Sequence, residues 1–554
     1  MQKLQDDLFF LFLFILPFQT VYLWREPIIG GGKWQYGTIG IYASSLVLAC
    51  AIVLGALLKA KALKSESIGV RMKKMWRERK SDAFLLLFVL WSGLSIIWAQ
   101  DTALAGYTFV KILLAADAFI MTRDLVRRGK MKQIVLVLFV AAMIQSVIGI
   151  GQFLTQETFS STLLGTSAYE SWQSGTSVLK NDTGRFLRAY GTFPHPNLYG
   201  LFLAVVLLIV TERIDSFVLT PQSRRLDSSP LKGERATLNI CNYNTLTWLG
   251  KFLPPPLCVV RIEEGCGWYA YFQWVASLFG ILIILLGLIV SFSRLAWGGF
   301  ALGFVFLSLK TAWNKCICHS GLRAGIQEII NTGSRVKSRS LASDRGKPGM
   351  TRRYRCAYFS TIVISTVIFA GILHETVFPR FDGGVVDREG SVVDRMSTYR
   401  DAFQIVRAHS FLGVGVGNET AELIRLHPDR PIWDIQPAHD VLLLVCSELG
   451  IPGLVLSLCF FFSLFIPKNR EVSSLQKKTK NVVIPAKPVL GPHRGAGIST
   501  WLPESFKRTT VFPNVEIFLV LIPSLLLDHF LWDSNFGLLF LFVILGTLEH
   551  SKKI

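Results

Sequence analysis

Apolar residues occur along this chain in long blocks separated by polar stretches. A helix needs about 20 mostly apolar residues to cross a bilayer. Blocks of about that length predict twelve membrane helices, at 8–24, 37–58, 82–98, 103–121, 133–154, 192–211, 272–293, 295–313, 358–374, 441–466, 512–531 and 535–549. The pattern therefore predicts an all-α, polytopic integral membrane protein.

The placement of basic residues predicts how these helices are oriented. With the N-terminus inside, 43 of the 58 Lys and Arg residues fall in the predicted inner connections and termini, Lys310 near the inner end of its span makes 44, and 13 fall in the outer segments. An excess of positive charge in the connections of one side marks the cytoplasmic side. We therefore expect both termini to be cytoplasmic.

Composition supports the membrane class and narrows the partners. Hydrophobic residues make up 51% of the 554 residues and charged residues only 17%, which argues against a soluble enzyme, a coiled coil or a disordered chain. The net charge of +20 could indicate nucleic acid binding, but the inner connections account for it, so we expect no nucleic acid partner. Cys316 and Cys318 lack a second pair at zinc spacing, so we expect no metal site.

Three long polar segments in the predicted inner connections lack clear periodicity: 215–268, 316–356 and 470–510. They resemble translated repeat elements inserted in frame, and we expect them to be dispensable; the alternative is an ordinary cytoplasmic loop with a regulatory or partner role. The chain then divides into 1–214 with six helices, the insert-like loop 215–268, 269–313 with two helices, the insert-like loop 314–357, 358–466 with two helices around the outer loop 375–440, the insert-like loop 467–511, and 512–554 with two helices.

Two outer segments carry polar groups beside a predicted helix. In 185–206, Arg188 precedes a Pro-His-Pro-Asn turn, and Asn197 takes the position of an N-cap. The alternative for His195 and Asn197 is a simple turn into the membrane. Arg294 lies between two apolar blocks, where an arginine is costly unless it is paired or faces water; the alternative is an anchor that extends to the interface.

The third outer segment is the richest in polar groups. Residues 395–408 have helical spacing and predict an amphipathic helix on the outer surface. The glycine-rich run 413–418 lacks the strand-turn-helix context of a dinucleotide site, so we expect it to allow close backbone approach. His439 begins the next span, and Glu448 follows nine residues later on another helix face, so we expect no direct pair between them.

Taken in order, these motifs resemble those of the O-antigen ligase/polymerase superfamily. The pattern comprises Arg395, HSFLGVGVGN (409–418), His439-x-x-x-Leu443, Glu448-Leu-Gly450-Ile-Pro-Gly453, the FPHPN turn and Ser293-Arg294. The resemblance implies a GT-C-like arrangement in the bacterial cytoplasmic (inner) membrane, with a large periplasmic loop between the ninth and tenth helices. Asp440 departs from the small polar or amide residue that the family usually has after its histidine.

The resemblance also implies a reaction. Such proteins transfer a glycan from a polyprenyl (undecaprenyl) diphosphate carrier to an acceptor hydroxyl at the periplasmic face, in lipopolysaccharide or polysaccharide biosynthesis. We expect an inverting glycosyltransferase of the O-antigen ligase type that uses no cofactor and no metal. Histidine suits a general base, and arginine suits a leaving diphosphate. The implied catalytic residues are His439, Arg188 and Arg294, and the implied substrate-binding residues are Arg395, Arg400, His195, Asn197 and Glu448.

The resemblance leaves the acceptor open. A lipid A-core acceptor defines a ligase, a growing glycan defines a polymerase, and a protein acceptor defines an O-oligosaccharyltransferase. A reading of another class is a multi-span polysaccharide transporter or flippase. That reading predicts charged groups along a central path and pseudo-repeated halves, and we find neither in the sequence.

Overall fold

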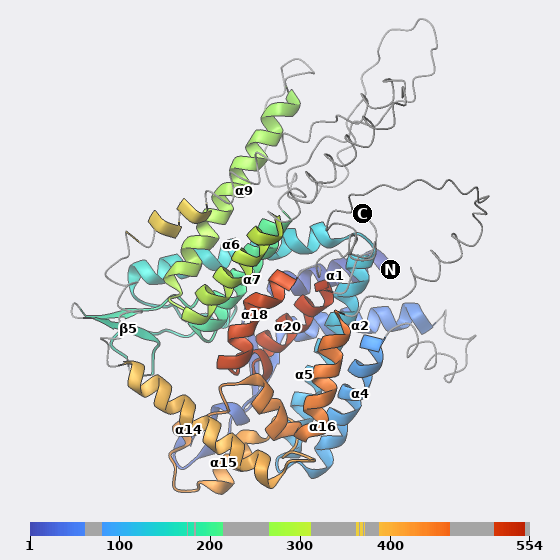
Figure 1. Ribbon diagram of the computed structural model, residues 1–554, viewed down its shortest axis with the longest axis vertical. Helices are drawn as coiled ribbons and strands as arrows, with labels where there is room; N and C mark the ends of the chain where they lie inside the picture. Colours follow the sequence, from blue (N-terminus) through green and yellow to red (C-terminus); the bar gives the residue numbers. More distant parts are fainter. Residues whose placement is uncertain are drawn as a thin grey trace, which may run out of the picture.

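The computed structural model describes residues 1–60, 80–213 apart from 174, 182 and 183, 265–311, 362–364, 366–368, 371, 387–465 and 515–548. Most of these residues are helical (Figure 1). Residues 294–311 form a helix between α9 and the undescribed segment that follows. The named helices are α1 (Gln2–Ile15), α2 (Ala43–Ala60), α4 (Lys80–Leu94), α5 (Thr102–Arg127), α6 (Met131–Thr155), α7 (Pro196–Glu212), α9 (Gly265–Val290), α14 (Asp387–Ala408), α15 (Glu419–Leu426), α16 (Val441–Ser463), α18 (Val515–Leu527), α19 (Phe530–Asp533) and α20 (Asn535–Leu548), with short 3-10 turns η1 (Gln35–Gly37), η2 (Ser95–Trp98) and η4 (Ile432–Asp434).

The all-α prediction needs one correction, because three small antiparallel sheets accompany the helices. Each sheet has two strands, and the pairs are β1 (Val21–Arg25) with β4 (Ile39–Tyr42), β2 (Ile28–Ile29) with β3 (Gly32–Lys33), and β5 (Val178–Asn181) with β6 (Gly184–Leu187). Aromatic and β-branched residues, such as those in the run Val21-Tyr-Leu-Trp, favour strands. In a hydropathy count the same residues look like part of a membrane helix.

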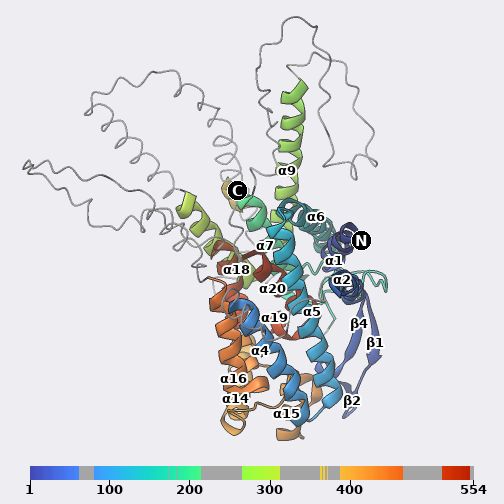
Figure 2. The same cartoon turned by 90° about the vertical axis from the view of Figure 1, so that its right-hand side faces the viewer.

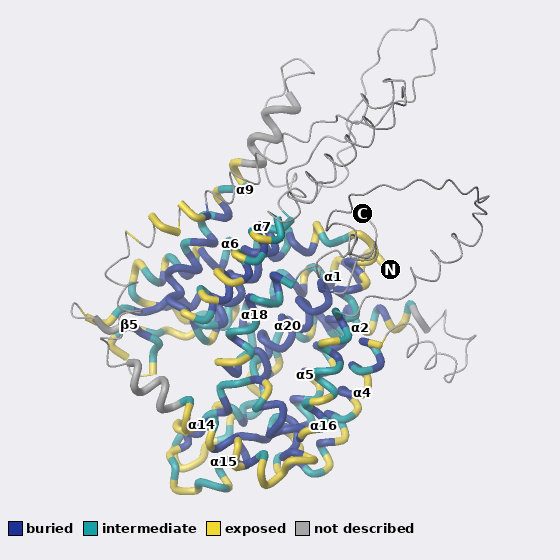
Figure 3. The backbone as a smooth tube through the Cα atoms, in the orientation of Figure 1, coloured by how far each residue is buried: buried dark blue, intermediate teal, exposed yellow. Residues whose placement is uncertain are grey.

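The centre of the bundle is formed by α7 and α20. Every residue of α20 is buried, and so is nearly every residue of α7 (Figure 3). The two helices meet through aromatic rings, with Phe202 against Phe536 and Phe540. A helix that is apolar on every face belongs inside a bundle. At about 1.5 Å per residue, the 14 residues of α20 span about 21 Å, less than the roughly 30 Å of bilayer core, so α20 serves as an internal packing element.

Four described helices are long and apolar enough to cross a membrane, namely 80–98, 102–127, 131–155 and 441–463, and five shorter apolar helices accompany them. The chain is therefore a multi-pass membrane protein, and the count of twelve stays a prediction. Three predicted spans are wrong in part. The 8–24 helix ends at Ile15, the 37–58 span begins with strand β4 and is helical only from Ala43, and the 512–531 helix breaks after Leu527. Most of 358–374 lies outside the described residues.

Polar contacts show which helix ends lie together. Asp6 of α1 contacts Arg128 and Lys130 at the α5–α6 junction, and we call this end of the bundle the Asp6 end. The N-terminus lies toward the Asp6 end, while α14 and α15 cover the other end, which we call the α15 end (Figures 1 and 2). The contact between the start of α1 and the α5–α6 junction agrees with the sequence prediction, which puts both segments on the same side of the membrane. Which end faces the cytoplasm stays a prediction.

A break within α16 joins this helix to the glycine-rich loop. Gly450 has a φ of +68° and Pro452 follows it, so the regular hydrogen bonding of the helix stops there. The loop supplies the missing partners, because the N–H groups of Val414 and Gly415 donate to the carbonyls of Ser447 (3.0 Å) and Glu448 (2.9 Å). A Cβ on Gly413 would lie 2.3 Å from the backbone carbonyl oxygen of Glu448. The predicted close backbone approach is thus confirmed.

Candidate active site

His439 lies at the α15 end, just before α16 begins. Asp440 caps that helix by accepting the Leu443 N–H at 2.8 Å, which fixes the backbone at His439. The half-buried His439 also contacts α14, since its Nδ1 lies 3.4 Å from Thr398 Oγ1 and the Tyr399 hydroxyl donates to its carbonyl at 3.1 Å. The predicted amphipathic helix over 395–408 is therefore present as part of α14, and it holds His439 in place.

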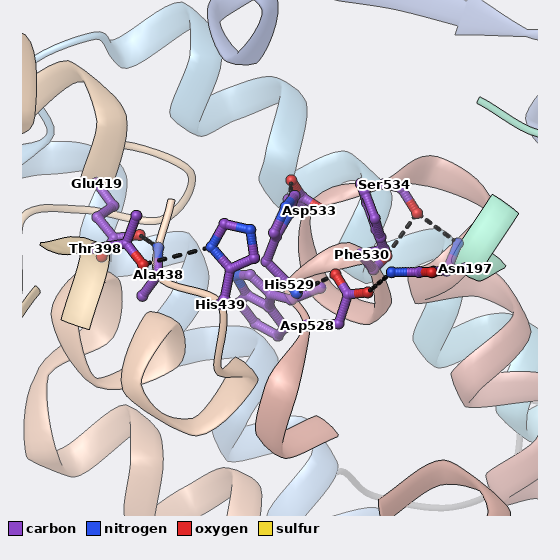
Figure 4. Close-up of polar contacts among 12 residues, drawn as sticks. Asn197, Thr398, Glu419, Ala438, His439, Asp528, His529, Phe530, Asp533 and Ser534 are labelled. Carbon is purple, nitrogen blue, oxygen red and sulfur yellow. Dashed lines mark hydrogen bonds and ion pairs between the residues drawn. The ribbon is translucent and has the colours of Figure 1, made fainter. Parts of the chain in front are cut away.

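A second histidine, which the sequence did not suggest, lies against His439. The His529 ring is perpendicular to that of His439, with centroids 4.8 Å apart (Figure 4). His529 is in the break between α18 and α19, and its side chain is 3% exposed. Its Nδ1 lies 2.8 Å from Asp533 Oδ2. The two histidines are 90 positions apart in the sequence, so only the packing of α16 on the α18–α19 break brings them together.

A chain of hydrogen bonds leads from this break to Arg188. Arg188 Nη2 donates to Asn197 Oδ1, and Asn197 Nδ2 donates to Asp528 Oδ2, both at 2.9 Å. The backbone N–H of His529 then donates to Asp528 Oδ1 at 2.9 Å. Figure 4 shows the Asn197–Asp528–His529 part of this chain. A predicted phosphate-binding arginine and the predicted base thus belong to one cluster of contacts.

Arg188 also ties other segments together. Its Nε donates to the Ser291 carbonyl and its Nη1 to Ser177 Oγ, each at 2.9 Å, and the residue is only 7% exposed. Three protein segments therefore orient one guanidinium group beside the start of α7. A charge held this firmly acts on its surroundings from a fixed position, since little reorganisation accompanies binding.

The start of α7 corrects one prediction. His195, and not Asn197, is the N-cap, because His195 Nδ1 accepts the Asn197 N–H at 3.1 Å. Pro196 is the first helical residue, where a missing N–H is harmless. Since the backbone of Asn197 is already helical, its side chain is available to bridge Arg188 and Asp528. The His195 ring packs on Phe530, with centroids 4.9 Å apart.

The protein environment shifts the pKa values of His439 and His529 in opposite directions. Burial lowers the pKa of His439, and the nearby His529 and Arg395 lower it further. Burial also tends to lower the pKa of His529, but Asp533 and Asp528 outweigh it, so the pKa of His529 is raised. A neutral imidazole therefore stands beside one that tends to carry a charge. This is the kind of divergence that separates the acid and base roles in enzyme sites.

Two charged residues from other helices form hydrogen bonds with α19. Lys111 of α5 donates to the Asp533 carbonyl at 2.8 Å. Glu448 of α16 accepts the Trp532 indole N–H at 2.8 Å. As expected, no contact among the described residues pairs Glu448 with His439. Glu448 positions α19 and, through it, His529.

The other predicted site residues, three arginines, differ in how far they are buried. Arg395 of α14 is half-buried and close enough to His439 to affect its pKa. Arg294 is exposed at the first residue of helix 294–311, three positions after the Ser291 that binds Arg188. Arg400 is exposed on α14, and no contact in the described part of the chain joins it to the two histidines.

Comparison with known protein families identifies one domain in this chain. Residues 279–458 match the family model of O-antigen ligase. The chain contains an O-antigen ligase domain. This makes the protein a glycosyltransferase-type enzyme of the membrane, as the sequence motifs implied. No curated protein matches the chain.

The O-antigen ligase domain holds only part of the cluster. Arg294, Arg395 and His439 lie within residues 279–458, whereas the Asn197 bridge and the α18–α19 break lie outside them. Every contact of His439 with His529 therefore joins the matched domain to chain beyond it. The sequence did contain a signal for this break, because Asp528 and His529 interrupt an apolar run.

Proposed function

We propose that this enzyme transfers a glycan from a polyprenyl (undecaprenyl) diphosphate carrier to an acceptor hydroxyl, with inversion at the anomeric carbon. The observation that carries the proposal is the placement of His439, half-buried and fixed at the start of α16, in one cluster with Arg188. We place this cluster at the periplasmic face of the bacterial inner membrane, because the basic connections belong to the other side.

In the proposed reaction, the acceptor oxygen attacks the anomeric carbon of the lipid-linked glycan. The bond from that carbon to the diphosphate oxygen breaks, and the diphosphate leaves with the electron pair. His439 accepts the proton of the acceptor hydroxyl. An imidazole must be neutral to accept a proton, and burial, His529 and Arg395 lower the pKa of His439 to about 3, so the free ring is neutral. A single displacement of this kind inverts the anomeric centre.

Arginines supply the positive charge that the leaving diphosphate needs. We assign this role to Arg188, whose guanidinium is fixed by three segments, and to Arg294, which is exposed near the same turn. Arg395 and Arg400 on α14 are further candidates for donor binding. Guanidinium groups remain charged at all relevant pH values and can bind two phosphate oxygens at once.

Reconstitution tests the proposal directly. The purified full-length chain in proteoliposomes is mixed with undecaprenyl diphosphate glycan and, in separate reactions, with lipid A-core, a free glycan and an acceptor peptide. We expect transfer to one of them, with release of undecaprenyl diphosphate and no loss of activity in EDTA. Absence of transfer to all three acceptors contradicts the proposal, and a loss in EDTA that Mg²⁺ restores contradicts its metal-free form.

The preferred acceptor in this experiment decides among ligase, polymerase and protein glycosylase. We put the ligase first because the family matched is that of O-antigen ligase. A deletion strain gives an independent readout. Loss of a ligase leaves lipid A-core without O-chain, whereas loss of a polymerase leaves core with a single repeat unit. Movement of the lipid-linked glycan across the vesicle membrane without transfer favours the flippase reading.

A further inference from the structure

His529 is buried directly against His439. It is 2% exposed as a whole residue, and its ring lies edge to face with the His439 ring at 4.8 Å. Its other flank is fixed by Asp533 Oδ2 at 2.8 Å from Nδ1. A buried imidazole bound to a carboxylate can keep a proton, and the carboxylate fixes the orientation of the ring.

The surroundings of the two rings decide which of them is charged. His529 has carboxylates on both sides in sequence, whereas no carboxylate binds the side chain of His439 among its described contacts. The titratable and charged groups that face His529 are Asp528, Asp533, His439, His195 and Tyr36, and those that face His439 are His529, Asp533, Arg395 and His195. The cationic partner of the pair is therefore His529.

We propose that His529, held by Asp533, is a positioning residue that carries positive charge beside His439 and so keeps His439 neutral and ready to accept the acceptor proton. This inference rests on the proposed function, in which His439 is the base. Two imidazoles this close do not both take a proton easily, since like charges repel across a water-poor site. The lowered pKa of His439 and the raised pKa of His529 agree with this division.

A chain of hydrogen bonds also links His529 to Arg188, the proposed diphosphate-binding arginine. Asp528 accepts the backbone N–H of His529 with one oxygen and the Asn197 amide with the other, and Asn197 binds Arg188. Arg188 and His529 are thereby joined through a single carboxylate.

The variant His529→Asn tests the proposal, because an asparagine amide can still donate to Asp533 but carries no charge. The measurement is kcat/KM for transfer by the full-length chain in proteoliposomes, followed across the acidic and neutral range. Activity needs neutral His439, so it falls as the pH drops through the pKa of His439. Without the His529 charge that pKa rises, and we expect the acidic limb to move to higher pH by about 1 unit.

Control variants distinguish the effect of the His529 charge from an effect on folding. The wild-type chain distinguishes failure of this inference from failure of the proposed function. His409→Asn makes the same change at an exposed histidine of the α15 end, and it should leave the limb in place. If His529→Asn does not fold, His529→Gln serves instead. If the acidic limb of the pH profile does not move, or if kcat/KM falls equally at every pH, this inference alone is overturned. Absence of transfer by the wild-type chain overturns the proposed function and this inference together.

Discussion

The Asp6 end and the cluster around His439 both bury charged groups, but they neutralise them differently. At the Asp6 end, permanent cations bind the carboxylates. Arg128 contacts Asp6 at 2.7 Å, and Lys310 contacts the fully buried Glu516 at 2.6 Å. At the α15 end, the buried Asp528 has an amide and a backbone N–H as its partners, and its neighbour is a histidine.

This difference indicates what each end is for. A carboxylate paired with lysine or arginine is already neutralised, so it has little charge to offer to a substrate. Histidines have an ordinary pKa near the physiological range, so their charge depends on their surroundings. The α15 end also has such pairs, between Arg430 and Asp401 and between Arg425 and Glu422. The contrast therefore assigns the Asp6 end to stability and the cluster around His439 to proton transfer. The predictions below test this contrast in order of their expected effect on transfer.

The largest effect is expected from His439→Ala. Removing a general base costs about 100-fold or more in rate, while the fold should persist because the Asp440 cap and the α14 contacts through Tyr399 involve the backbone of this segment. The measurement is transfer per mole of protein, with thermal unfolding in detergent as a check on folding. His409→Ala, at an exposed site of the same end, is the control. Near-normal transfer by His439→Ala would refute its role as base.

A smaller loss of transfer is expected from Asn197→Ala. This change leaves one Arg188 N–H and one Asp528 oxygen without their partner, and each unsatisfied buried group costs about 1–3 kcal/mol. We therefore expect a lower unfolding temperature together with a transfer rate reduced about tenfold, since Arg188 and the α18–α19 break lose their link. Full activity with lowered stability would show that the bridge is structural only.

The smallest effect on transfer is expected from Lys310→Met, at the Asp6 end. Glu516 then stays buried without its nearest cation, and breaking a buried pair in this way costs about 3–5 kcal/mol. Stability should fall strongly while transfer per folded molecule is unchanged. The double variant Lys310→Met/Glu516→Leu should recover most of the lost stability, as measured by thermal unfolding. A loss of transfer in the folded fraction would contradict the division between the two ends.

The sequence could predict the helices and the residues with strong local signals. Long apolar blocks showed the membrane class, and helical spacing showed the helix now seen within α14. The glycine-rich run signalled close backbone contact, which the α16 break explains. In each case a short window of sequence contains the physical cause, namely burial in lipid, periodicity or backbone freedom.

The sequence could not predict contacts between distant segments. Asn197 and Asp528 are 331 positions apart, and neither residue suggests the other. His529 was hidden because a hydropathy window averages it with its many apolar neighbours in 512–531. Asn197 was predicted as a cap because asparagine is a common one, but the ring of His195 takes that role.

The break in α16 has a consequence for the construction of chimeric enzymes. Two segments donate to its carbonyls. The N–H groups of Val414 and Gly415 donate to residues 447 and 448, and the Trp91 indole donates to residue 449 at 2.8 Å. In return, the Ile451 N–H donates to the Ser410 carbonyl at 2.9 Å. An unpaired carbonyl in lipid is very unfavourable. Designers who exchange acceptor loops between relatives should therefore transplant 409–453 as one block and place their junctions outside it.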